Sequence, residues 1–328
     1  MRVFRGFQHP GIAQACALTI GNFDGVHRGH QAMLALLRSE ARHRRLPSCV
    51  MTFEPHPRDF FARRTDPAGT AVRAPARIST LRDKLCELSS CGVDQVVVLR
   101  FDQRLASLSP QGFVDSVLRQ GLGARYVLVG DDFRFGARRA GDYAMLDAAG
   151  QAGGFDVARM LSYEVRGLRV SSSAVRQALQ SGDMMVAAAL LGRPYSISGH
   201  VVRGRQLGRA LGFRTLNLRF EHPQPAALGI FVVAVHGLTD QALPGVASLG
   251  VRPTVEDAGR VQLESHVFDW PTALGLEAGY GRVLRVELLH KLHDERHYAG
   301  MDELRAGIAQ DTADARAWWA GRATPLAV

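Results

Sequence analysis

Hydrophobic positions in the first half of the chain form short continuous runs separated by longer amphipathic stretches. Continuous apolar runs of this length are typical of buried parallel strands. The runs are residues 15–20, 48–53, 95–99 and 126–129, and the stretches with helical spacing are residues 31–45, 79–90, 110–120 and 143–152. This alternation predicts an α/β fold with a doubly wound parallel sheet, in which ligands bind at the carboxyl ends of the strands.

The pattern changes after about residue 190, where glycine and proline become more frequent. Short runs of β-like character follow one another there, and a helical stretch closes the chain. The runs are residues 196–202, 230–235, 261–268 and 283–289, and the helical stretch is residues 301–319. Short strands separated by turns predict an antiparallel barrel or sandwich. We therefore expect two domains, residues 1–185 and residues 186–328.

The net charge of +9 could indicate a nucleic-acid partner. Only Lys84 and Lys291 are lysines, no run of five basic residues occurs, and aromatic residues do not interleave the arginines. We therefore predict no nucleic-acid partner, although an arginine-rich nucleic-acid binder without catalysis stays an alternative. The longest apolar run, residues 226–235, is too short to span a bilayer, so we expect no membrane partner.

The four cysteines form no Cys-x-x-Cys pair, which argues against a zinc ribbon or a redox motif. A reducing compartment fits this usage, and we predict a cytoplasmic protein. The sequence leaves self-association open.

Residues 21–30, Gly-Asn-Phe-Asp-Gly-Val-His-Arg-Gly-His, follow the first predicted strand and open an amphipathic helix. A glycine turn before a helix N-terminus is typical of an anion site. His27 and His30 fall on one face of the first helical turn, so both rings can reach one phosphate. A zinc pair is the alternative, but two histidines without a third ligand hold zinc poorly. The predicted phosphate site comprises Gly21, Phe23, Asp24, Gly25, His27 and His30.

Two further loops follow predicted strands. Residues 53–57, Phe-Glu-Pro-His-Pro, form a loop that its prolines make rigid around His56. In residues 129–136, Phe133 and Phe135 either flank a planar ring or belong to the core, and Asp132 adds a carboxylate.

A second anion site is indicated by residues 169–176, where three serines precede a helical run that carries Arg176. Ser172 is either a helix cap or a phosphate ligand. Two anion sites and a ring pocket together favour nucleotidyl transfer. An attacking phosphate is already ionised, so catalysis needs positioning and charge stabilisation rather than a strong base.

These motifs, in this order, resemble the bacterial bifunctional riboflavin kinase/FAD synthetases, over residues 17–319. The resemblance implies a Rossmann-like adenylyltransferase domain of the HxGH type, followed by an antiparallel β-barrel with a terminal helix. It implies that ATP phosphorylates riboflavin to FMN and then adenylylates FMN to FAD, with Mg²⁺ in both halves. It also assigns His27 and His30 to the transferring phosphoryl group and Ser172 and Arg176 to phosphates, and it places Asp132 near the flavin or nucleotide. We predict that His56 and Phe133, in the neighbouring loops, bind the same flavin or nucleotide.

Residues 199–217 are rich in glycine and arginine, which suits either close approach to phosphates or a bulged strand pair. They resemble the kinase loop of the same family. The resemblance assigns Gly204, Gly208, Arg209 and Gly212 to phosphate, Thr215 and Asn217 to Mg²⁺, and Glu264 to the role of general base for the ribityl 5′-hydroxyl.

Four residues depart from the family pattern, one of them Leu216, which stands where the family usually has alanine. Arg214 replaces a usual proline, Ser248 a usual asparagine and His293 a usual arginine. They support an alternative in which only FMN adenylyl transfer is retained and the barrel has weak or lost kinase activity.

Overall fold

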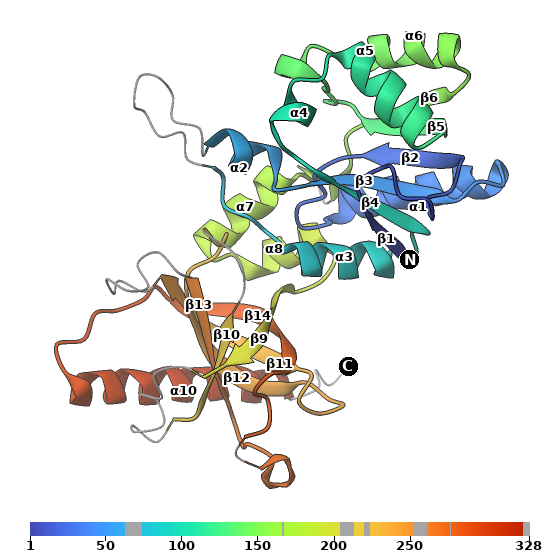
Figure 1. Ribbon diagram of the computed structural model, residues 1–328. Helices are drawn as coiled ribbons and strands as arrows, with labels where there is room; N and C mark the ends of the chain where they lie inside the picture. The colour runs from blue at the N-terminus through green and yellow to red at the C-terminus, as the bar shows by residue number, and fades with distance from the viewer. Residues whose placement is uncertain are drawn as a thin grey trace. The chain divides into compact units, whose positions relative to one another are not determined.

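The computed structural model describes residues 1–62, 74–165, 167–203, 213–219, 224–251, 261–275 and 277–323. The chain folds into two compact units (Figure 1). The first unit contains Met1–Pro75 and Lys84–Ser171, and the second contains Ala76–Asp83 and Ser172–Val328. The functional division expected between residues 185 and 186 stays a prediction.

A six-stranded, fully parallel sheet forms the centre of the first unit, in the order β1-β4-β3-β2-β5-β6. The chain adds β3 and β4 on one side of β2, then β5 and β6 on the other, which confirms the doubly wound sheet. The strands are β1 (Arg2–Arg5), β2 (Cys16–Ile20), β3 (Ser48–Glu54), β4 (Gln95–Arg100), β5 (Ala124–Gly130) and β6 (Asp156–Met160).

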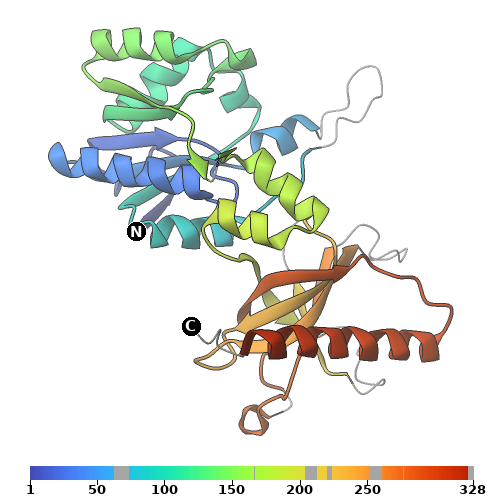
Figure 2. The same ribbon diagram turned by 180° about the vertical axis from the view of Figure 1, so that it is seen from behind.

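Helices and short irregular elements connect these strands. They are α1 (Arg28–His43), α2 (Pro57–Ala62), α3 (Leu81–Ser90), α4 (Gln103–Ala106), α5 (Pro110–Phe113), the π-helix η1 (Val114–Gly121), η2 (Ala137–Arg139) and α6 (Tyr143–Gly153). Helix α1 lies along one face of the sheet and buries Leu34, Leu37 and Ala41 (Figure 2). A small hairpin, β7 (Glu164–Val165) and β8 (Leu168–Arg169), follows β6.

The core of the first unit runs through the middle strands. Leu18, Cys49, Val97 and Val127 are fully buried in it. Each buried side chain of this size contributes about 1.5–3 kcal/mol to the stability of the fold. The carboxyl ends of these strands, where the loops with candidate chemistry begin, therefore rest on a rigid platform.

The second unit contains a closed antiparallel barrel in the order β10-β13-β12-β11-β14-β9. A barrel, not a sandwich, is thus confirmed. Its strands are β9 (Tyr195–Val202), β10 (Thr215–Arg219), β11 (Gly229–His236), β12 (Leu243–Val251), β13 (Val261–Val267) and β14 (Val283–His293), and this unit also holds α7 (Ser172–Ser181), α8 (Met184–Leu191), η3 (Thr272–Leu274) and α10 (Met301–Ala323).

Helix α10 lies along the outside of the barrel (Figures 1 and 2). It packs there through Ala315 on Val232, Val246 and Phe268, which form a small apolar cluster. In β9 and β13, buried residues alternate with less buried ones, as expected for strands with one face toward the barrel interior. Across the described ranges, no helix has both the length and the apolar composition needed to cross a bilayer.

Candidate active sites

The three loops with candidate chemistry in the first unit follow β3, β2 and β5, which are neighbours in the sheet. The histidine loop follows β2, the loop that contains His56 follows β3, and the loop that contains Asp132 follows β5. Strands β2 and β5 flank the point at which the strand order reverses. Ligands bind at this point in open parallel sheets, because adjacent loops diverge there and leave a crevice.

The histidine loop has an unusual backbone. Gly25 has a φ of +84°, and two residues with side chains, Phe23 at +48° and Val26 at +39°, also adopt the left-handed region. In residues other than glycine, such a conformation costs about 1–3 kcal/mol and persists only where the surroundings enforce it. Phe23 and Val26 are each only 1% exposed, so their packing holds the loop in this shape.

His27 and His30 form a stacked pair at the N-terminus of α1. Their ring centroids lie 3.7 Å apart with an interplanar angle of 14°. His27 is the N-cap residue, and its Nδ1 accepts a hydrogen bond from the backbone N–H of His30 at 3.3 Å. A neutral His27 ring must then have its proton on Nε2, which makes that nitrogen a donor for a phosphate oxygen.

His30 is held in its neutral form. Burial, then His27, then Lys84 lower the pKa of His30 well below 6.5. Its Nδ1 is buried and has no hydrogen-bond partner within the described part of the chain. His30 therefore provides a neutral imidazole, which can stabilise charge by donating a hydrogen bond.

The other predicted residues of the first unit occupy different environments. His56 is buried, and its Nδ1 accepts a hydrogen bond from the backbone N–H of Arg58 at 3.1 Å. Asp132 is exposed. Phe133 is half-buried and stacks on Phe135, which is buried in the core, with centroids 5.5 Å apart.

Ser172 and Arg176 lie on α7 and belong to the second unit, whereas the histidine pair belongs to the first. Arg176 is buried, and its Nε donates a hydrogen bond of 2.6 Å to the carbonyl of Ala76. That bond joins α7 to Ala76–Asp83, the short earlier segment of the chain that also belongs to the second unit.

In the barrel, the predicted kinase residues form a row across neighbouring strands. Asn217 on β10 lies opposite Glu264 on β13, and Glu264 lies opposite Ser248 on β12. Opposite residues share a face of the sheet. Thr215, two residues before Asn217, lies on the same face, while the intervening Leu216 points into the barrel. Asn217 is 6% exposed, and its Oδ1 accepts a hydrogen bond from Gln262 Nε2.

The four predicted phosphate-binding residues of the kinase loop, Gly204, Gly208, Arg209 and Gly212, lie outside the described residues. Arg214, the residue directly before β10, makes contacts on two sides. Its guanidinium lies 3.7 Å from the centroid of the Trp270 ring, and its carbonyl accepts a hydrogen bond of 2.8 Å from His266 Nδ1. These contacts restrain the backbone at the position where the family usually has proline.

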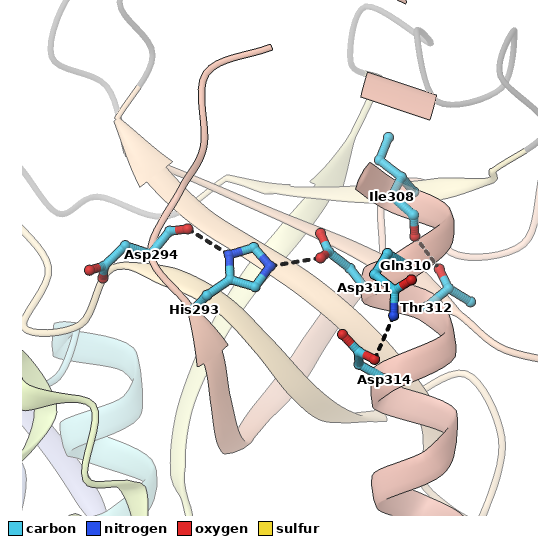
Figure 3. A network of polar contacts seen from close by, with 7 residues as sticks. All are labelled: His293, Asp294, Ile308, Gln310, Asp311, Thr312 and Asp314. Atoms are coloured by element: carbon cyan, nitrogen blue, oxygen red, sulfur yellow. Dashed lines mark hydrogen bonds and ion pairs between the residues drawn. The ribbon is translucent and has the colours of Figure 1, made fainter. Parts of the chain in front are cut away.

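Two of the other departures also have defined partners. Ser248 Oγ donates a hydrogen bond of 3.0 Å to Glu295 Oε1. His293 contacts the carbonyl of Asp294 and the carboxylate of Asp311 (Figure 3). Arg214, Ser248 and His293 therefore all have partners within the described part of the second unit.

Comparison with known proteins decides the identity of both units. A family model for FAD synthetase matches residues 9–174, and a model for riboflavin kinase matches residues 191–319. The curated bifunctional riboflavin kinase/FMN adenylyltransferase of Escherichia coli K12 is 46% identical over 318 residues, which covers 96% of this chain and 97% of that protein. The chain belongs to the bifunctional riboflavin kinase/FMN adenylyltransferase family.

Other members of this family are similar over nearly the full length. The Pseudomonas fluorescens enzyme is 44% identical and covers 93% of each chain, and the Haemophilus influenzae enzyme is 38% identical and covers 97% of this chain and 99% of that one. A solved structure described as a macrolide-efflux protein from Streptococcus pneumoniae matches with a TM-score of 0.76 and 25% identity, over 96% of this chain and 99% of that chain.

As a member of this family, the chain is a transferase with riboflavin kinase and FMN adenylyltransferase activities, and ATP is its co-substrate. Both halves match, so the reading in which the barrel has lost its activity is not supported.

Sequence reasoning missed two features of these sites. Lys84, which interacts with His30, lies on a helix whose pattern indicated an ordinary amphipathic segment. Glu295 contacts Ser248 from 47 residues away, and no local signal in the sequence indicates that contact.

Proposed function

We propose that residues 1–185 transfer the adenylyl group and that residues 186–328 phosphorylate riboflavin. The observation that carries the first assignment is the stacked pair of His27 and His30 at the carboxyl end of β2, beside the reversal of strand order. The assignment of the second domain rests on the row of Asn217, Glu264 and Ser248 on the barrel surface.

In adenylyl transfer, a phosphate oxygen of FMN attacks the α-phosphorus of ATP, and pyrophosphate leaves. His27 Nε2–H donates to an oxygen of the α-phosphate, and the neutral His30 ring assists in stabilising the charge that develops there. The attacking oxygen has no proton to lose, so no general base is needed. The remaining proposed contacts are Gly21, Phe23, Asp24 and Gly25 with ATP, Ser172 and Arg176 with phosphates, and His56, Asp132 and Phe133 with flavin or nucleotide.

In the kinase reaction, the ribityl 5′-hydroxyl of riboflavin attacks the γ-phosphorus of ATP, and ADP leaves. Glu264 accepts the hydroxyl proton as the new O–P bond forms. Its place between Asn217 and Ser248 in the strand register supports this role, because side chains from three strands can then orient one hydroxyl group.

The side chains in this row fit Mg²⁺ as a further ligand of the kinase domain. Thr215, Asn217 and Glu264 offer hydroxyl, amide and carboxylate oxygens on one face of two adjacent strands, and Mg²⁺ prefers oxygen ligands shared with phosphates. Among the residues that the structure describes, no group of three or more His, Cys, Asp or Glu could hold a metal by itself. When bound, Mg²⁺ would neutralise charge on the ATP phosphates, with Thr215 and Asn217 as its protein ligands.

The test is a crystal structure of the full chain with Mg²⁺ and a non-hydrolysable ATP analogue. We expect one nucleotide with its α-phosphate against His27 and His30, and a second with its phosphates beside Thr215 and Asn217. An empty histidine loop, with the phosphates bound elsewhere in the first domain, would overturn the adenylyl-transfer site. A second nucleotide away from β10 would overturn the kinase site.

The cytoplasmic location and the absence of nucleic-acid and membrane partners stay predictions, and self-association stays open. Salt-dependent binding of RNA or DNA by the purified enzyme would contradict the prediction that the protein has no nucleic-acid partner.

A further inference from the structure

Lys84 on α3 is a fully buried lysine, with 0% of its surface exposed. Lysine is almost never fully buried, because removing an ammonium group from water is costly. The position is also unusual for this chain, in which the only other lysine is Lys291 and the remaining basic residues are arginines. A buried ammonium group at this position therefore indicates that Lys84 has a specific role.

The contacts of Lys84 lead to the histidine loop. Its Nζ donates a hydrogen bond of 3.4 Å to Thr52 Oγ1, near the carboxyl end of β3. Thr52 Oγ1 in turn donates a hydrogen bond of 3.2 Å to the carbonyl of Asn22, which lies between Gly21 and Phe23. Two hydrogen bonds thus link α3, through β3, to the backbone of the loop that begins at the end of β2.

Lys84 also acts on His30 through its charge. After burial and His27, it is the third cause that lowers the pKa of His30. These three influences favour the neutral ring of His30, and Lys84 is the one that comes from outside the loop.

We propose that Lys84 is a positioning residue for adenylyl transfer, which holds the histidine loop at Asn22 through Thr52 and sets the electrostatic environment of the His30 ring. This inference rests on the proposed role of the histidine pair. In the proposed role, Lys84 acts only through Thr52 and His30 and does not contact a substrate. Removing it should therefore change how fast bound substrates react more than how tightly they bind.

The experiment measures FAD formation from FMN and Mg-ATP by the full-length enzyme, as kcat and KM over a pH series. For Lys84→Met we expect kcat to fall by about 10²-fold, the cost of misplacing a reacting group by about 1 Å, with little change in KM. Loss of the positive charge raises the pKa of His30. The limb of the pH profile, which is the part where kcat changes because His30 titrates, therefore moves to higher pH. Lys84→Arg keeps the charge and should keep the limb in place.

Two variants guard against misreading a folding defect. Gln95→Met replaces another fully buried polar side chain. Gln95 lies at the amino end of β4, whereas the histidine loop lies at the carboxyl ends of the strands, so this variant should leave the limb unchanged. Thr52→Val keeps the shape and the lysine charge but removes the link to Asn22, so it should lower kcat by about tenfold without moving the limb.

Several outcomes would overturn the proposal. They are a Lys84→Met enzyme with an unmoved limb, a Gln95→Met enzyme with the same shift, or, if Lys84→Met does not fold, a Thr52→Val enzyme with unchanged kcat. His30→Ala, measured in the same assay, separates the proposed role of Lys84 from the proposed role of the histidine pair. If His30→Ala retains full FAD formation, the proposed site is wrong; if it loses activity while Lys84→Met does not, only the role of Lys84 is wrong.

Discussion

His293 Nε2 lies 2.7 Å from Asp311 Oδ1 and thereby ties the end of β14 to the middle of α10 (Figure 3). The other ring nitrogen, Nδ1, lies 2.7 Å from the carbonyl of Asp294. His293 thus makes two polar contacts at the position where the family usually has an arginine.

We predict that Asp311→Ala lowers the free energy of unfolding of the barrel by about 1–3 kcal/mol, because it leaves a largely buried donor unpaired. The side chains of His293 and Asp311 are only 17% and 9% exposed. Asp314→Ala, one turn further along the same helix, removes an exposed contact with Gln310 and should change stability by less than about 0.5 kcal/mol. Urea unfolding followed by tryptophan fluorescence measures both variants, because all three tryptophans lie in residues 270–319. Equal decreases in the free energy of unfolding of the two variants would show that the His293–Asp311 contact stabilises the barrel no more than an exposed contact does.

His27→Ala should lower the rate of FAD formation from FMN by about 10²–10³-fold, the effect of removing one donor to a developing charge. The kinase half should be unaffected, so FMN accumulates when riboflavin and Mg-ATP are supplied. Chromatographic separation of riboflavin, FMN and FAD measures both steps in one assay. His43→Ala, which changes an exposed histidine at the other end of α1, is the matched control and should retain both steps. A His27→Ala enzyme that is impaired equally in both steps would contradict the assignment.

Glu264→Gln should give the opposite pattern. Loss of the general base is expected to slow FMN formation by about 10²–10⁴-fold, whereas FAD formation from supplied FMN continues. Glu287→Gln changes a glutamate on β14 of the same barrel that pairs with His236 and Arg285, and it should leave the kinase step intact. If FMN formation survives in Glu264→Gln, the proton has another acceptor and the row on the barrel surface has been misassigned.

The strands that the sequence predicted well are those that are buried along most of their length. The apolar runs at β2, β3, β4 and β5 matched the observed strands to within two residues at each end. The edge strands β1 and β6 were missed, because only Phe4 is buried in the first and none of the five residues is fully buried in the second. In the barrel, Pro244, Gly245 and Gly250 interrupt the pattern of β12, so pairing with β11 and β13 rather than local preference forms that strand.

The site was predictable only where its chemistry is local in the sequence. The spacing of His27 and His30 indicated one face of a helix, and their rings do stack. The contact between His293 and Asp311 joins residues 18 positions apart in different elements and depends on how α10 docks. The predicted helix over residues 110–120 became a short α5 followed by a π-helix, a change of hydrogen-bond pattern that periodicity does not resolve.

The buried, neutral state of His30 predicts how the stability of the first unit depends on pH. Its pKa is lowered well below 6.5 in the folded protein. As the pH falls below about 6.5, the unfolded chain takes up a proton at this residue and the folded chain does not, so stability falls until the pH reaches the lowered pKa. His30 alone can contribute a slope of up to about 1.4 kcal/mol per pH unit, and His30→Gln should remove it.

Hydrogen exchange of amides in β2 and β5 between pH 7.5 and 5 measures this slope in the first unit, after correction for intrinsic exchange rates. His43→Gln, in the last turn of the same helix, is the control. It should leave the slope unchanged or alter it in the opposite sense, because the helix dipole favours a protonated ring at the C-terminus. An identical slope in the wild type and in His30→Gln would mean that His30 accepts a proton as readily in the folded protein as in the unfolded chain, which would contradict its assignment as a neutral donor.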